Sequence, residues 1–187
     1  MPKNNLIKVF DHVLTKEQQY RLYEHLNGCN WQLIRLNSDV DTYFTSTFFN
    51  GGMNIPEEYD IFKQFHSPIQ VLYDKIVELT EPYVGKYRPT TIYANCQTYG
   101  LNSYIHTDSC GDYTFIYYAN LEWNSQNEGG TSLYQYNQEG EADCVKYVSY
   151  RPNRLLLIPS NMPHRGMPVD RNHFGPRFIV VARGKLL

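Results

Sequence analysis

The sequence predicts a mainly β fold of the sandwich or jelly-roll type, preceded by helices. From residue 90 onward the chain consists of short extended runs, and Gly, Pro or Asn separates most of them. Many short strands punctuated in this way are typical of a sandwich or a jelly roll. Helical patterns precede these runs, and helices followed by strands argue against a parallel α/β sheet.

Two helices are predicted in the N-terminal part. Thr15 can cap the first helix through its hydroxyl group, and Gly28 can end it. Ser67 can cap the second helix, with Pro68 in its first turn, where no intrahelical backbone N–H is needed. We expect a shorter helical piece over residues 57–65.

A strand and a long loop are expected between these two helices. Residues 31–36 form the expected strand. Residues 39–56 show no steady periodicity and contain the pair Gly51-Gly52. A loop of this length in a compact domain is either functional or mobile, so we treat residues 39–56 as a candidate lid over a site.

Six strands are expected in the second half of the chain. They share short runs of β-branched, aromatic and other apolar residues, and they cover residues 91–99, 113–121, 131–136, 145–150, 154–158 and 178–182. The sequence contains no repeat, low-complexity tract or linker. We therefore expect one domain over residues 1–187, with a helical part over about 1–89 and a β core over about 90–187.

The composition argues against several classes of protein. With 42 % hydrophobic and 19 % charged residues, the 187-residue chain suits a globular domain rather than a disordered one. Its net charge of −2 and the absence of a Lys/Arg block make a dedicated nucleic-acid or anionic-membrane binder unexpected. No apolar run approaches the about 20 residues needed to cross a bilayer. The polar N-terminus and four cysteines without a CxxC motif indicate free thiols in the cytoplasm.

Three residues form a candidate metal site. In an extended segment His106 and Asp108 project to the same side, so that one imidazole and one carboxylate can converge on an ion. His164 follows the apolar run 154–159 and is the best third ligand, whereas His173 has no strand leading into it. Two histidines and one carboxylate are the facial triad of non-haem Fe(II) oxygenases, which leaves coordination positions open.

Five motifs follow one another in the second half of the chain. In chain order they are Tyr99-Gly100 ahead of His106-Thr107-Asp108, Tyr117-Tyr118-Ala119-Asn120-Leu121, Glu128-Gly129-Gly130-Thr131, Leu155-Leu156-Leu157-Ile158-Pro159-Ser160 with His164, and Pro168-Val169 with Arg177-Phe178. In this order and spacing they resemble the prolyl-4-hydroxylase-like branch of the 2-oxoglutarate/Fe(II)-dependent dioxygenases. The resemblance covers residues 93–183, about half of the chain. Two departures are a longer spacing from His164 to Arg177 and a missing Glu after Gly130.

The resemblance implies a fold, a set of cofactors and an activity. The fold is a double-stranded β-helix, the cupin-like form of the jelly roll. The cofactors are Fe(II) held by the triad, 2-oxoglutarate as co-substrate, and O2. The reaction is hydroxylation of a C–H bond with release of succinate and CO2, and the substrate is a peptide or protein side chain or a small molecule.

The resemblance also implies a binding site for the distal carboxylate of 2-oxoglutarate. Arg177 is the expected anchor, because a guanidinium group pairs with a carboxylate through two parallel hydrogen bonds. Tyr99 and Thr131 are the expected hydroxyl partners of the same carboxylate. Arg183 and Arg171 are alternative anchors, and further polar candidates near this region are Asn95, Gln97 and Tyr104.

Other functions stay open at this point. A cupin-type protein with another metal and a non-oxygenase activity shares the fold, as does a non-catalytic binding module. A nucleobase demethylase is a third alternative, but the near-neutral charge offers no basic face for its substrate. The sequence does not identify the primary substrate.

Overall fold

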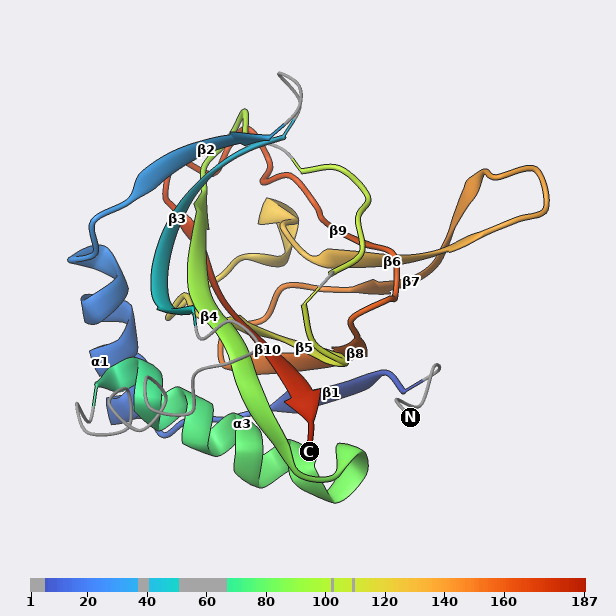
Figure 1. Ribbon diagram of the computed structural model, residues 1–187. Coiled ribbons are helices and arrows are strands. Elements are labelled where there is room, and N and C mark those ends of the chain that lie inside the picture. The colour runs from blue at the N-terminus through green and yellow to red at the C-terminus, as the bar shows by residue number, and fades with distance from the viewer. Residues whose placement is uncertain (1–5, 37–40, 51–66, 102, 109) are drawn as a thin grey trace.

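The computed structural model describes residues 6–36, 41–50, 67–101, 103–108 and 110–187. These residues form two antiparallel sheets, with two helices beside the larger one (Figure 1). The larger sheet has seven strands in the order β1-β8-β5-β10-β4-β3-β2, and the smaller has three in the order β7-β6-β9. The prediction of a mainly β jelly roll with N-terminal helices, in the form of a double-stranded β-helix, is confirmed.

The strands and helices have the following bounds. The larger sheet contains β1 (Lys8–Asp11), β2 (Gln32–Leu36), β3 (Asp41–Asn50), β4 (Tyr87–Gln97), β5 (Tyr113–Tyr118), β8 (Arg154–Pro159) and β10 (Arg177–Leu186). The smaller sheet contains β6 (Thr131–Tyr136), β7 (Ala142–Val148) and β9 (His164–Gly166). The helices are α1 (Lys16–Asn27), α3 (Pro68–Val84) and the 3-10 turn η1 (Ser125–Asn127).

Both long helices begin at the caps predicted from the sequence. The Thr15 hydroxyl accepts a hydrogen bond from the backbone N–H of Gln18, and the Gln18 side chain accepts one from the N–H of Thr15. The Ser67 hydroxyl accepts from the N–H of Gln70, and Pro68 occupies the first turn of α3. Among the described helices, none combines the length and the apolarity needed to cross a membrane.

The side chains on the two faces of β10 pack into two different cores. Phe178 and Val180 point to one side and pack with the buried residues of α1 and α3. Ile179 and Val181 point to the other side and pack with Leu133 of the smaller sheet. Because side chains alternate along a strand, one strand separates the helix-covered core from the space between the sheets.

The prediction of a long loop over residues 39–56 is wrong for its central part, because residues 41–50 form β3. This strand pairs with β2 on one side and with β4 on the other, where Phe44 lies opposite Cys96. Aromatic residues at adjacent positions, Tyr43-Phe44 and Phe48-Phe49, hide the alternation that identifies a half-buried strand. The rest of the candidate lid, and the helix expected over 57–65, lie outside the described residues.

Candidate metal centre

The structure brings His106, Asp108 and His164 together between the sheets. Their candidate ligand atoms all lie within 4.8 Å of one another, and Nε2 of His164 lies 3.8 Å from Oδ2 of Asp108. The two imidazole centroids are 4.4 Å apart. Groups at these separations can share one ion with metal–ligand bonds of about 2 Å.

Backbone hydrogen bonds hold the His-x-Asp segment against β9. The N–H of His106 donates to the carbonyl of His164 at 3.0 Å, and the N–H of His164 donates back at 2.8 Å. The N–H of Asp108 donates to the carbonyl of Ser160 at 2.8 Å. The segment therefore pairs with the chain that carries the third candidate ligand, and the geometry of the three groups is set by main-chain bonds.

The two histidines turn the same ring nitrogen toward the site. Nδ1 of His106 lies 3.0 Å from the carbonyl of Tyr104, and Nδ1 of His164 lies 2.9 Å from the carbonyl of Met162. A carbonyl can only accept, so each Nδ1 carries the proton and each Nε2 is left with a free lone pair. Burial lowers the pKa of His164, although the nearby Asp108 opposes this shift, and the neutral ring is the form that binds a metal.

Asp108 is buried, and a different donor contacts each of its two oxygens. Oδ2 accepts a hydrogen bond from the Thr114 hydroxyl at 2.6 Å. Oδ1 accepts one from Nη2 of Arg183, and the same Nη2 also donates to the Tyr93 hydroxyl at 2.9 Å. The side chain of Asp108 is 2 % exposed, so water cannot replace either contact.

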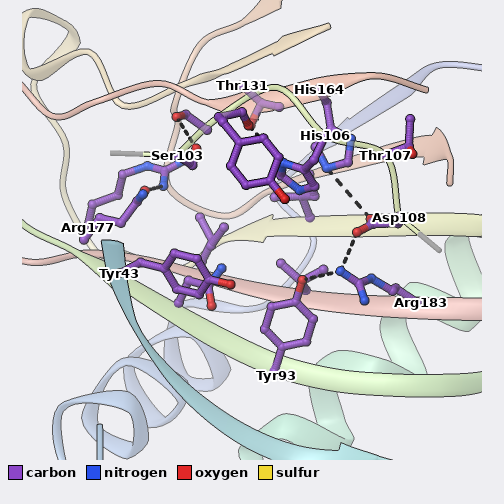
Figure 2. Close-up of a pocket in the computed structure, with 17 residues that line it drawn as sticks. Tyr43, Tyr93, Ser103, His106, Thr107, Asp108, Thr131, His164, Arg177 and Arg183 are labelled. Carbon is purple, nitrogen blue, oxygen red and sulfur yellow. Dashed lines mark hydrogen bonds and ion pairs between the residues drawn. The ribbon is translucent and has the colours of Figure 1, made fainter. Parts of the chain in front are cut away.

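A cavity of about 280 Å³ connects the triad with the inward face of β4 and β10 (Figure 2). Alternate residues of β10 line it, from Arg177 through Ile179 and Val181 to Arg183. Figure 2 shows the two arginines at opposite ends, with Asp108 close to Arg183. The polar candidates Asn95, Gln97 and Tyr104 also line the cavity.

Arg177 is fully buried and has no carboxylate partner among the described residues. Its Nε donates to the carbonyl of Gly129, and its Nη1 donates to Oε1 of Gln97. Its Nη2 has no hydrogen-bond partner in the described part of the chain. Burial lowers the pKa of Arg177, as expected for a cation without a counter-ion. A buried guanidinium with a free N–H in a cavity fits a bound carboxylate.

The two expected hydroxyl partners have different positions. Thr131 lines the cavity, and its hydroxyl accepts a hydrogen bond from the Tyr118 hydroxyl at 2.9 Å. Tyr99 is 61 % exposed and does not line the cavity. The physical reason is that β4 ends at Gln97, which lies opposite Arg177 in the register, and Tyr99 follows in the turn beyond it.

The two alternative anchors are not equivalent to Arg177. Arg183 lines the cavity but is paired with Asp108, and Arg171 is exposed and lies outside the lining. The sequence reading missed Thr114 and Tyr118 as contacts of the site. Tyr118 could have been found from its spacing, because it lies two residues beyond the inward-facing Ile116 on β5.

Comparisons with known proteins agree with this architecture. Residues 94–182 match the family model described as the 2OG-Fe(II) oxygenase superfamily. A search of curated proteins gives no significant match.

Solved structures similar to this chain share its fold at low sequence identity. A prolyl hydroxylase from Trichoplax adhaerens, in complex with a hypoxia inducible factor peptide fragment, has a TM-score of 0.61 and 20 % identity over 98 % of this chain and 84 % of that one. A Pseudomonas putida prolyl-4-hydroxylase has a TM-score of 0.59 and 13 % identity, over 97 % and 92 %. HygX from Streptomyces hygroscopicus, with nickel and 2-oxoglutarate bound, has a TM-score of 0.62 and 13 % identity, over 96 % and 82 %.

Proposed function

Because residues 94–182 match the family model of the 2OG-Fe(II) oxygenase superfamily, we propose that this chain hydroxylates a C–H bond of its substrate. The enzyme class expected from the sequence is confirmed, as are Fe(II), 2-oxoglutarate and O2 as the cofactors of the superfamily. The proposed substrate is a peptide or protein side chain, or a small molecule. The proposed co-products are succinate and CO2.

We assign the metal to His106, Asp108 and His164. Two imidazole nitrogens and one carboxylate oxygen suit Fe(II) and leave coordination positions for the co-substrate and O2. The orientation of both Nε2 atoms toward Asp108 supports this assignment. When bound, the iron supplies the redox chemistry together with 2-oxoglutarate and O2, and the protein supplies binding and orientation.

The free N–H of the buried Arg177 is the observation that carries this proposal. A dicarboxylate that reaches the triad with one end can place its other carboxylate against this guanidinium, which has no counter-ion among the described residues. The Thr131 hydroxyl also lines the cavity, bonded to Tyr118, which interacts with the charge of Arg177, and it is the proposed second contact. Tyr99 is not kept in this proposal, because it is exposed.

Apolar side chains separate the two polar ends of the cavity. Ile116, Ile179 and Val181 line the stretch between Arg177 and the triad. They can pack against the methylene groups of a bound 2-oxoglutarate.

A similar structure and the lining of the cavity support the proposed substrate class. One similar structure is a prolyl hydroxylase in complex with a peptide fragment. The cavity wall beside Asp108 contains the ring of Tyr93, and the 45 % exposed Tyr104 also lines the cavity, so a substrate can contact aromatic and hydroxyl groups. A peptide side chain or a small polar molecule fits such a wall.

Two measurements test the proposal. Anaerobic addition of Fe(II) and 2-oxoglutarate should produce the weak visible absorption band of the chelate, and aerobic incubation should convert 2-oxoglutarate slowly to succinate. His106→Ala and Asp108→Ala should abolish both signals, while Arg154→Met, which lies outside the cavity lining, should keep them. A folded wild-type protein that binds iron but shows neither the band nor succinate would refute the proposal.

A further inference from the structure

Arg183 is the second arginine that β10 directs into the cavity. It lies six residues beyond Arg177 on the same face of the strand, which corresponds to about 20 Å along the chain. Among the described residues, Nη2 of Arg177 has no hydrogen-bond partner, whereas Nη2 of Arg183 donates to Asp108 and Tyr93 and its Nε has no partner. The two arginines therefore perform different tasks, although both line one cavity.

The two carboxylate oxygens of Asp108 have different neighbours. Oδ2 lies 3.8 Å from Nε2 of His164 and accepts from Thr114, and it is the oxygen nearer to the candidate ligands. Oδ1 accepts the hydrogen bond from Arg183. Figure 2 shows the carboxylate of Asp108 between the histidines and Arg183. With one donor on each oxygen, the plane of the carboxylate is fixed.

We propose that Arg183 is a positioning residue, which holds Oδ1 of Asp108 so that only Oδ2 faces the metal. This inference rests on the metal site of the proposed function. A carboxylate released from Arg183 can rotate, so that Oδ2 no longer faces Nε2 of His164 and the three ligand atoms no longer converge on one ion.

Two effects of Arg183 on metal binding have opposite signs. The positive charge of Arg183 repels a divalent cation, so the loss of this charge, taken alone, tightens metal binding. The hydrogen bond from Arg183 orients the buried carboxylate of Asp108, so the loss of this bond, taken alone, weakens metal binding. The loss of such a partner of a metal ligand typically weakens metal binding about 10- to 100-fold. Orientation dominates here, because the carboxylate lies between Arg183 and His164, and water cannot replace the lost donor.

The test uses Co(II) as the probe, because its visible spectrum reports coordination number and its binding is measured without turnover. Arg183→Met should bind Co(II) about 10- to 100-fold more weakly than the wild type and should show a changed Co(II) spectrum. Arg154→Met is the control, because it breaks another Arg–Asp pair of the same sheet, with Asp11, outside the cavity lining. It should lower the melting temperature and leave Co(II) affinity unchanged.

Tyr93→Phe is the second control, because it removes the other partner of Nη2 and keeps the ion pair. Its Co(II) affinity and spectrum should match the wild type. A folded Arg183→Met protein with wild-type or tighter Co(II) binding would overturn the inference. If that variant does not fold, Arg183→Lys decides: its point charge cannot reproduce the planar guanidinium, so an unchanged spectrum and affinity would overturn the inference. A wild-type protein that binds no Co(II) would instead contradict the metal site itself.

Discussion

The hydroxyl group of Tyr118 donates a hydrogen bond to the hydroxyl group of Thr131 at 2.9 Å, and this bond joins the two sheets. Tyr118 lies on β5 of the larger sheet and Thr131 begins β6 of the smaller one. Both residues are buried, and Tyr118 is close enough to Arg177 to interact with its charge. A single pair of hydroxyl groups thus contributes to sheet packing and to the proposed carboxylate site.

Thr131→Val tests both contributions of this pair. The Tyr118 hydroxyl keeps only a longer contact of 3.4 Å to the carbonyl of Val148, so we expect the variant to lose about 1–3 kcal/mol of unfolding free energy. Urea unfolding of the metal-free protein measures this loss. We also expect weaker binding of 2-oxoglutarate, because the proposed second contact to its carboxylate is lost.

The matched control for this substitution is Thr80→Val. The Thr80 hydroxyl lies 2.8 Å from the Tyr87 hydroxyl and is buried away from the cavity. This variant should lose a comparable unfolding free energy and keep the wild-type affinity for 2-oxoglutarate. Equal 2-oxoglutarate affinity in both variants would remove Thr131 from the site.

Local patterns in the sequence predict the triad and the carboxylate anchor. His106 and Asp108 form a two-residue motif, and His164 and Arg177 each follow or begin a readable strand. Their spatial meeting depends on strands whose direction and boundaries the turn residues mark. The same reasoning succeeds for α1 and α3, because Thr15 and Ser67 carry their own capping signals.

Contacts that depend on register could not be read in this way. Asp108 and Arg183 are 75 positions apart, and only the pairing of β10 with its neighbours brings them together. The choice between Gln97 and Tyr99 beside Arg177 depends on where β4 ends, which no local signal marks. Long-range pairing therefore decides which polar residues line the site, whereas local propensity decides which elements exist.

Arg177→Met separates the stability of the protein from its binding of 2-oxoglutarate. Methionine fills most of the volume and removes a buried charge that has no counter-ion among the described residues, which offsets part of the cost of leaving the Gly129 carbonyl and the Gln97 side chain unpaired. The metal-free protein should therefore lose no more than about 1–3 kcal/mol of unfolding free energy. The loss of charge-assisted hydrogen bonds should weaken 2-oxoglutarate binding by about 1.5–3 kcal/mol, or about 10- to 100-fold. Thermal unfolding of the metal-free protein measures the first quantity, and thermal unfolding of the Co(II)-loaded protein with and without 2-oxoglutarate measures the second. Full stabilisation by 2-oxoglutarate in this variant would exclude Arg177 as the anchor.

The lowered pKa of His164 predicts how the stability of the metal-free protein depends on pH. The unfolded chain binds the proton of this histidine near pH 6.5, whereas burial lowers the pKa in the folded protein. Between these two pKa values the unfolded state holds more protons, so unfolding free energy falls as the pH is lowered through this window. Urea unfolding between about pH 7 and pH 5 should show this loss.

Two variants show which histidines cause the loss of unfolding free energy at lower pH. His164→Gln removes the titrating group and should make the fall in unfolding free energy smaller. Burial also lowers the pKa of His25, which contributes in the same direction, so His25→Gln should remove a separate part of the fall. A His164→Gln protein with the full wild-type pH dependence would contradict the contribution of His164.

Gly130→Ala tests the close packing of the turn before β6. A Cβ atom at this position would lie 2.5 Å from the carbonyl oxygen of Val148 and 2.6 Å from the ring of Tyr147. The backbone must shift to relieve this contact, so we expect a loss of about 1–3 kcal/mol in unfolding free energy. The shift also displaces the adjacent Thr131, so 2-oxoglutarate affinity should fall with it.

Gly140→Ala is the control, because its positive φ of 81° strains alanine by about 1–2 kcal/mol while no atom of the described residues lies within 4 Å. Urea unfolding should show similar losses of unfolding free energy for both variants. Titration with 2-oxoglutarate should show a loss of affinity only for Gly130→Ala. Equal affinities of the two variants would mean that the turn tolerates the shift without moving the site.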